Sequence, residues 1–160
     1  VETQVVSGIA YSRDEARITI VQVLDRPGVA AGIFGTLADA NINVDMIVQS
    51  VSRDGRSANL TFTVTRADLP RALAALAGAR AAIGYDRVVA DENVAKISVI
   101  GVGMRSHAGI AHQMFRTLAD KGINIQAIST SEIKVSVLIA EDYTELAVRS
   151  LHTAYGLDAA

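Results

Sequence analysis

Hydrophobic residues in the first half of the chain change from strand-like to helical spacing and back. Ile18, Ile20 and Val21 belong to a β-branched run that predicts a strand over 17–24, and the loop 25–28, with its Pro and Gly, ends it. Apolar residues at helical spacing between 33 and 38 predict a helix next. The same reasoning predicts strands over 41–52 and 58–64 joined by an Asp-Gly hairpin, a helix over 67–80 and a strand over 83–90.

An internal repeat extends this order of elements into the second half. A shift of 81 places residues 28–47 on residues 109–128, and ten of these twenty positions are identical. The strands before these helices align better at a shift of 79, so the loop that enters the second helix is two residues longer. The second half therefore predicts a strand over 95–103, a helix over 109–121, strands over 123–131 and 133–140, and a helix over 142–155.

Each repeat follows the βαββαβ order of the ferredoxin-like split unit, which predicts an α+β fold with two such domains. The second repeat ends without its fourth strand, whereas the strand-like segment 5–11 belongs to neither repeat by its order. Because an open sheet edge is covered by such a strand, we expect this segment to complete the second sheet. The first domain, 15–91, would then be inserted into a second domain made of 1–14 and 92–160.

Composition narrows the classes of function. The net charge is −2, and there are only three Phe, four Tyr and no Trp, so the basic surface and the stacking aromatics of nucleic-acid binders are missing. Apolar stretches are shorter than a membrane span, and without cysteine there is no disulfide, thiolate nucleophile or Cys-based zinc site. We expect a cytoplasmic protein that binds neither nucleic acid nor membranes.

Residue clusters for catalysis, cofactors or metals do not stand out. A Gly101-Val102-Gly103 run resembles the start of a dinucleotide-binding motif, but Ser106 replaces its third glycine. His107 and His112 are five residues apart and do not share a helical face, so with His152 they do not form a metal-ligand set. We therefore expect no catalytic residue, cofactor or metal site in this chain.

The loop before the first helix of each repeat is the best candidate for a ligand site. Asp25 precedes a helix whose opening amides, at Gly28, Val29 and Ala30, have no partner within the helix and attract a carboxylate. This pattern taken alone favours ordinary capping of the helix by Asp25. The matching loop 103–109 is longer and contains Ser and His, which a simple cap does not require, and this difference favours a ligand.

Polar residues also interrupt the strand that follows each of these helices. A strand with one face in water accounts for Asp45, Gln126 and Ser129. Asn43 and Asn124 occupy the same place in both repeats, and for them a turn-forming role and a ligand-binding role are equally open.

Two motifs resemble one family closely. The runs 25–28 and 40–49 resemble the first ACT domain of aspartate kinases, and the runs 101–109 and 128–139 resemble the second. The resemblance covers essentially the whole chain and implies an allosteric region that binds threonine, and often lysine. Such binding inhibits the ATP-dependent phosphorylation of L-aspartate in lysine, threonine and methionine biosynthesis.

The resemblance also implies the partners of this chain. The kinase domain, which uses ATP, is absent from this sequence, so a catalytic aspartate kinase chain or domain would be one partner. The family further implies a homodimer through paired ACT domains, with effectors at the interface and the first ACT domain inserted into the second.

The effector-binding residues follow from the same resemblance. A threonine-like pocket would use Asp25, Gly28, Val29, Ala30, Asn43 and Gln49 of the first repeat with Asn124 and Ile125 of the second. A lysine-like pocket would use Met104, Ser106, His107, Gly109, Ile110, Ser131 and Glu132, with Glu132 as partner of a distal ammonium group. Amides would bind the α-carboxylate of the effector and Asp25 its ammonium group.

Other functions remain as alternatives. The first is a stand-alone ACT sensor that regulates a different biosynthetic enzyme. An RNA-binding ferredoxin-like module is disfavoured by the charge and by the missing strand aromatics, and a small enzyme on this fold is disfavoured because no nucleophile is visible.

Overall fold

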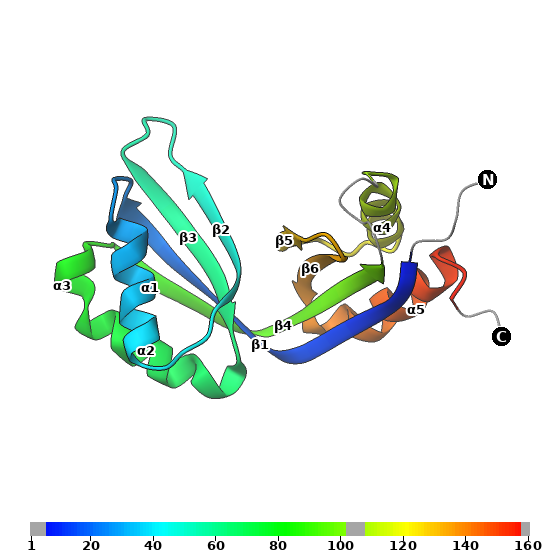
Figure 1. Cartoon of the computed structure of the whole chain (residues 1–160), viewed down its shortest axis with the longest axis horizontal. Helices are drawn as coiled ribbons and strands as arrows, with labels where there is room; N and C mark the ends of the chain where they lie inside the picture. Colours follow the sequence, from blue (N-terminus) through cyan, green and yellow to red (C-terminus); the bar gives the residue numbers. More distant parts are fainter. Residues whose placement is uncertain (1–5, 102–107, 158–160) are drawn as a thin grey trace. The chain divides into compact units, whose positions relative to one another are not determined.

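The computed structural model describes residues 6–101 and 108–157, and it divides into two compact units. The first-repeat unit is Asp14–Glu92. The second-repeat unit takes the described residues up to Arg13 and those from Asn93 onward. Two long strands, β1 (Val6–Leu24) and β4 (Arg87–Gly101), pass through both units (Figure 1).

The first-repeat unit is a four-stranded antiparallel sheet with helices on one face. Its other elements are α1 (Val29–Asp39), β2 (Asp45–Val51), β3 (Ser57–Val64), the 3₁₀ turn η1 (Arg66–Asp68), α2 (Leu69–Gly78) and α3 (Arg80–Ile83). The strand order is β2-β3-β1-β4, the ferredoxin-like arrangement. Leu37 of α1 and Leu76 of α2 pack with Phe62 of β3 in one buried cluster, so α1 and α2 cover the same face of the sheet.

The second-repeat unit has the same plan. It adds α4 (Ala108–Asp120), β5 (Ala127–Thr130), β6 (Lys134–Ala140), the 3₁₀ turn η3 (Glu141–Tyr143) and α5 (Thr144–Ala154), with strand order β1-β4-β6-β5. The amino-terminal part of β1 is thus the fourth strand of this sheet. Val6 belongs to its core together with Leu118 of α4 and Leu151 of α5, and Ser7 Oγ donates a hydrogen bond to the Ile100 carbonyl at 3.2 Å.

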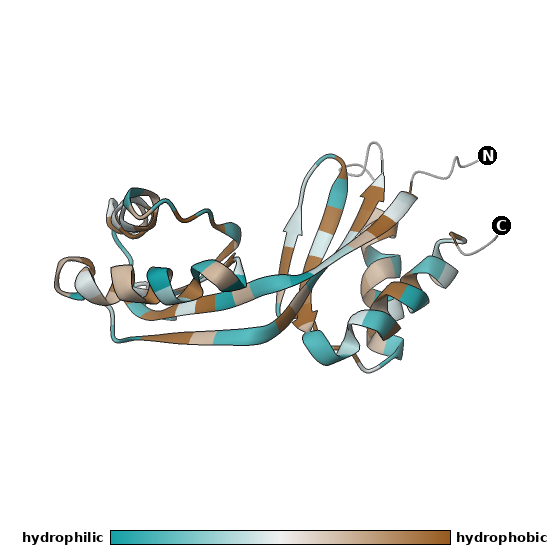
Figure 2. Cartoon of the chain, turned by 90° about the horizontal axis from the view of Figure 1, so that it is seen from below, coloured by the Kyte–Doolittle hydropathy of each residue, from teal (hydrophilic) through white to brown (hydrophobic). Residues whose placement is uncertain are grey.

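The alternation expected for half-buried strands is visible along the ribbon, where brown apolar bands interrupt pale and teal polar ones (Figure 2). In β3, Ala58, Leu60 and Phe62 are buried towards the helices, and Asn59 between them is exposed. In each sheet the opposite face carries a hydroxyl pair across neighbouring strands: Thr19 with Thr61 at 3.0 Å, and Ser98 with Ser136 at 2.7 Å. The predicted α+β fold of two ferredoxin-like domains is confirmed.

Several predicted boundaries are wrong. The predicted strands 5–11 and 17–24 fall, from residue 6 onward, on the one continuous strand β1. The described parts of the predicted strands 83–90 and 95–103 fall on the single strand β4, which begins at Arg87 and is described up to Gly101. Residue Ile83 closes helix α3 rather than opening a strand, because Gly84 adopts a left-handed conformation (φ 79°) that ends the helix. Strand β5 covers only four residues of the predicted 123–131.

The predicted strand 41–52 begins four residues late because a left-handed turn follows helix α1. Asn41 has φ 57°, and the Ile42 amide donates to the Leu37 carbonyl at 3.0 Å, which is the bonding of a Schellman motif. After α4 the same motif is formed by Leu118, Gly122 (φ 72°) and Ile123. The repeated Leu and Ile positions therefore end the helices, and the turn residue is Asn41 or Gly122 rather than Asn43 or Asn124.

Candidate functional site

A pocket of about 390 Å³ lies in the first-repeat unit, at the loop that connects strand β1 to helix α1. This volume falls in the range of small-molecule sites. Its lining comes from the loop after β1, the first turn of α1, and strands β2 and β3: Val23, Leu24, Asp25, Arg26, Pro27, Gly28, Val29, Ala30, Ile33, Gln49, Ala58 and Leu60. Five of the predicted threonine-site residues are therefore in one pocket: Asp25, Gly28, Val29, Ala30 and Gln49.

The amino end of α1 supplies uncapped amides to this pocket. Gly28 is the N-cap residue, and its left-handed φ of 92° turns the chain sharply into the helix. No side chain of the described residues caps the helix, and its first turn contains no acidic residue. The capping role that the loop pattern favours for Asp25 is therefore wrong, since the N-cap is a glycine. The positive end of the helix dipole is left to face the pocket.

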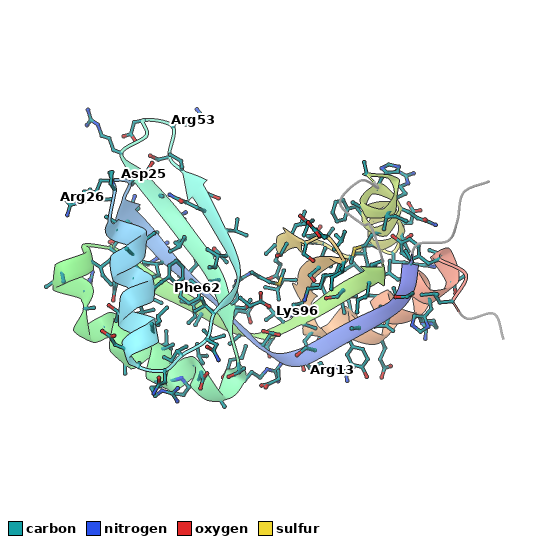
Figure 3. All side chains as sticks on the ribbon, viewed as in Figure 1. Arg13, Asp25, Arg26, Arg53, Phe62 and Lys96 are labelled. Atoms are coloured by element: carbon teal, nitrogen blue, oxygen red, sulfur yellow. The ribbon has the colours of Figure 1, made fainter. Side chains whose placement is uncertain are left out.

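The carboxylate of Asp25 lies beside the amide side chain of Gln49. Gln49 Nε2 donates to Asp25 Oδ1 at 3.4 Å, although the two residues are 24 positions apart. The Asp25 amide also donates to the Arg56 carbonyl at 3.0 Å, which joins the loop to the residue just before β3. Both side chains are exposed, so their polar groups can reach a ligand. Asp25 is labelled in Figure 3.

The floor of the pocket is apolar, and its residues are not among those that the sequence predicts for the site. Val23, Ile33, Ala58 and Leu60 are each at most 5% exposed. They come from β1, α1 and β3, and Val23, Ile33 and Leu60 belong to the buried cluster between the sheet and its helices. The alternation of β3 is the signal that could have identified Ala58 and Leu60 as pocket residues.

Three predicted residues of the threonine-like set lie outside this pocket. Asn43 is exposed in the turn between α1 and β2. Asn124 and Ile125 belong to the second-repeat unit, where Asn124 is exposed and Ile125 packs against that unit's own core. The structure does not bring these three side chains to Asp25 within one unit.

The lysine-like set is described only in part. Met104, Ser106 and His107 lie outside the described residues. Gly109 is exposed in the first turn of α4. Its counterpart Gly28 is left-handed and precedes helix α1, whereas Gly109 already lies inside α4 and is not left-handed.

Two other residues of the lysine-like set, Ile110 and Ser131, form hydrogen bonds within the second-repeat unit. The Ile110 carbonyl accepts a hydrogen bond from the Tyr155 hydroxyl at 2.6 Å, and burial raises the pKa of Tyr155 to about 12. Ser131 Oγ accepts from the Ile133 amide at 3.3 Å in the turn between β5 and β6, with Glu132 exposed between them.

Among residues 6–101 and 108–157, no group of three or more His, Cys, Asp or Glu side chains could hold a metal ion. His112 is exposed and His152 is half-buried, both on helices. No described helix is long and apolar enough to cross a membrane.

The pocket of the first-repeat unit can bind a zwitterion. The uncapped amide of Ala30 suits a carboxylate, as does that of Val29 if it leaves its 3.4 Å bond to the Arg26 carbonyl. The carboxylate of Asp25 suits an ammonium group. Gln49 offers an amide that can donate or accept a hydrogen bond. These groups match the backbone end of an α-amino acid, and the buried apolar floor matches a short side chain.

Two family models of the ACT domain match the chain, over residues 17–81 and 97–155. The aspartate kinase of Stutzerimonas stutzeri is 56% identical over 158 residues, which are 99% of this chain and 38% of the relative. The chain thus spans well under half the length of the curated relatives it matches.

Solved structures that resemble the chain are also aspartokinases or their regulatory subunits. A structure of aspartokinase alpha and beta subunits matches at a TM-score of 0.88 and 51% identity, covering 94% of this chain and 99% of that one. The ligand-free regulatory subunit of aspartate kinase from Thermus thermophilus matches at 0.89 and 38% identity, covering 94% and 98%. Aspartokinase III of Escherichia coli in complex with lysine and aspartate matches at 0.69 and 26% identity, with 93% of this chain and 33% of that chain covered.

Proposed function

The chain belongs to the ACT-domain regulatory regions of the aspartokinases, and we propose that it binds threonine as an allosteric effector in the first-repeat pocket. Binding would inhibit the ATP-dependent phosphorylation of L-aspartate by the catalytic part of the kinase, which this chain does not contain. We also propose a cytoplasmic location, which agrees with the absence of cysteine.

The proposed binding mode assigns each end of the amino acid to a different element. The α-carboxylate accepts a hydrogen bond from the amide of Ala30, and one from that of Val29 in exchange for its 3.4 Å bond to the Arg26 carbonyl. The left-handed Gly28 opens the approach to these amides. The ammonium group binds the carboxylate of Asp25. Gln49, now bonded to Asp25 at 3.4 Å, binds the threonine hydroxyl, and the threonine methyl group contacts the apolar floor.

The uncapped, positively polarised end of α1 beside the Asp25 carboxylate carries this proposal. Calorimetric titration with threonine, lysine, methionine, homoserine and aspartate tests it. We expect saturable binding of threonine, whereas heats of dilution alone for all five amino acids would refute an effector site.

Lysine is the second proposed effector. The lysine-bound structure of the Escherichia coli relative supports this proposal. The site would use Met104, Ser106, His107, Gly109, Ile110, Ser131 and Glu132, with Glu132 as the partner of the lysine side-chain ammonium group. Glu132→Gln is expected to weaken lysine binding and leave threonine binding unchanged in the same titrations.

We propose further that two copies of the chain pair through their ACT units. Ile47 of β2 and Ile128 of β5 occupy the same place in both repeats and are 54% and 43% exposed on edge strands. Exposed apolar residues on an edge strand favour association. Asn43, Asn124 and Ile125 would then complete effector sites across this interface. Sedimentation should give a dimer at micromolar concentration, and a stable monomer with threonine present would contradict it.

The domain boundaries 15–91 and 1–14 with 92–160 remain our proposal for the insertion. The two compact units and the place of Val6 in the core of the second-repeat unit support it. Replacing residues 14–92 by an Asn-Gly turn should leave a cooperatively folded second domain, because β1 and β4 are hydrogen-bonded neighbours. A product without a cooperative unfolding transition would contradict the insertion.

A further inference from the structure

Three arginines of the first-repeat unit stand beside the proposed effector pocket. Arg26 follows Asp25 in the pocket loop, and Arg53 and Arg56 flank the tip of the hairpin between β2 and β3. All three side chains are exposed, and Figure 3 shows Arg26 and Arg53 extending outward at the same end of the unit as Asp25. We call these three residues the arginine rim.

The guanidinium groups of the rim make no hydrogen bond or ion pair with the rest of the described chain. Three other exposed arginines are paired with nearby acids: Arg71 with Asp68 at 3.3 Å, Arg87 with Asp86 at 3.0 Å, and Arg116 with Asp120 at 3.3 Å. Exposed Arg149 has no such ion pair among the described residues. The rim therefore presents cationic groups whose hydrogen-bonding capacity is unused by the described residues.

The acid of the hairpin, Asp54, forms no ion pair with the rim arginines among the described residues, because neutral donors occupy its carboxylate. Ser52 Oγ donates to Asp54 Oδ1 at 2.6 Å, and the Arg56 amide donates to the same oxygen at 3.0 Å. These bonds lower the pKa of Asp54 and close the turn. With Gly55 in the left-handed region (φ 71°), they hold Arg53 and Arg56 on a defined tip.

The rim is joined to the pocket through the backbone. The Asp25 amide donates to the Arg56 carbonyl at 3.0 Å, and the Val29 amide donates to the Arg26 carbonyl at 3.4 Å. Arg26 also lines the pocket. A ligand that binds Asp25 and the first amides of α1 therefore restrains the segments that carry all three arginines.

We propose that the arginine rim docks on an acidic surface of the catalytic part of the kinase, and that it does so more tightly when the effector pocket is filled. This inference rests on the proposed function. The relatives of this chain have most of their length outside the matched region, so a large neighbouring surface exists for such docking.

Guanidinium groups bind carboxylates in a bidentate, charge-assisted manner, which suits an acidic protein surface. Exposed ion pairs of this kind weaken as salt rises, because the Debye length falls from about 10 Å at 0.1 M to about 3 Å at 1 M. Docking of the rim and binding of the effector must also affect each other reciprocally. If the filled pocket favours docking, docking must raise the affinity for the effector by the same factor.

The test uses the complete kinase, which is this chain with its own catalytic part, and the isolated chain, each as wild type and as Arg53→Gln/Arg56→Gln. Neither residue lines the pocket. The control is Arg116→Gln/Arg149→Gln, which removes two exposed arginine charges from the second-repeat unit. Threonine and lysine affinities are measured by calorimetry, and inhibition of aspartate phosphorylation is measured at low and high salt.

We expect the wild-type complete kinase to bind the effector about five- to a hundredfold more tightly than the isolated chain, within the usual range of allosteric coupling. The rim variant should lose this gain and its inhibition, yet bind the effector normally as an isolated chain. High salt should weaken inhibition of wild type and control alike.

Three results would overturn the proposal: a rim variant that is inhibited like wild type, a control that loses inhibition equally, or binding of RNA by the isolated chain that only the rim variant loses. No effector binding by the isolated wild-type chain would instead refute the proposed function.

Discussion

Replacing Asp25 by Asn is the sharpest test of the effector pocket. The change keeps the side-chain shape and an oxygen that can accept the 3.4 Å hydrogen bond from Gln49, but it removes the negative charge. Because Asp25 is exposed and does not cap α1, the free energy of unfolding should change by no more than about 0.5 kcal/mol. A charge-assisted contact with the effector ammonium group contributes roughly 1.5–3 kcal/mol.

At about 1.4 kcal/mol per decade, the threonine affinity of Asp25→Asn should fall by roughly ten- to a hundredfold. Calorimetric titration measures this fall directly, and thermal unfolding should show less stabilisation by added threonine, since the ligand binds only the folded state. Asp39→Asn is the matched control, because Asp39 is an exposed aspartate at the far end of the same helix. Equal threonine affinity for Asp25→Asn and wild type would show that the ammonium partner lies elsewhere.

Three further predictions concern the backbone and the second-repeat unit. Gly28→Ala should lower the free energy of unfolding by about 1–2 kcal/mol, because φ 92° strains an L-residue while no atom crowds the added methyl group; unchanged denaturant midpoints would contradict this. Gly122→Asn should cost less than Gly122→Val in the same assay, since Asn41 already occupies the equivalent left-handed position; equal losses would refute the shared Schellman motif. Tyr155, whose pKa is raised to about 12, should make the protein lose stability as pH rises from about 10 towards 12, because the unfolded chain releases this proton first. Tyr155→Phe should remove that alkaline loss in pH-dependent unfolding, at a cost of about 1 kcal/mol at neutral pH for the lost bond to Ile110; an unchanged alkaline profile would exclude Tyr155 as its cause.

Local rules account for most elements of the chain. The alternation of Ala58, Leu60 and Phe62 is sufficient to predict a strand and its buried face, because side chains of a strand point to opposite sides in turn. The repeat of twenty residues at a shift of 81 predicts two copies of one fold, since the same pattern buries the same helical face. The family resemblance, carried by the loop and strand motifs, is confirmed by the matches over nearly the whole chain.

Boundaries and the capping role were harder to predict because they depend on backbone conformation. The left-handed φ of Asn41 delays β2, and nothing in its local hydrophobic pattern indicates this. The left-handed Gly28 takes the N-cap position that the pattern favours for Asp25. A residue type restricts the conformations available, but the surrounding structure selects among them.

The sequence by itself determined the order of elements, the two-domain α+β class, and the loop that opens the pocket. Only the tertiary structure placed Gln49 against Asp25, because antiparallel pairing of β2 with β3 returns the chain to the end of β1. The same pairing brings Ala58 and Leu60 beneath the amino end of α1 and joins Arg56 to the pocket loop. Spacing along a chain describes neighbours within one element, whereas contacts between strands depend on register, which is decided when the whole sheet packs on its helices.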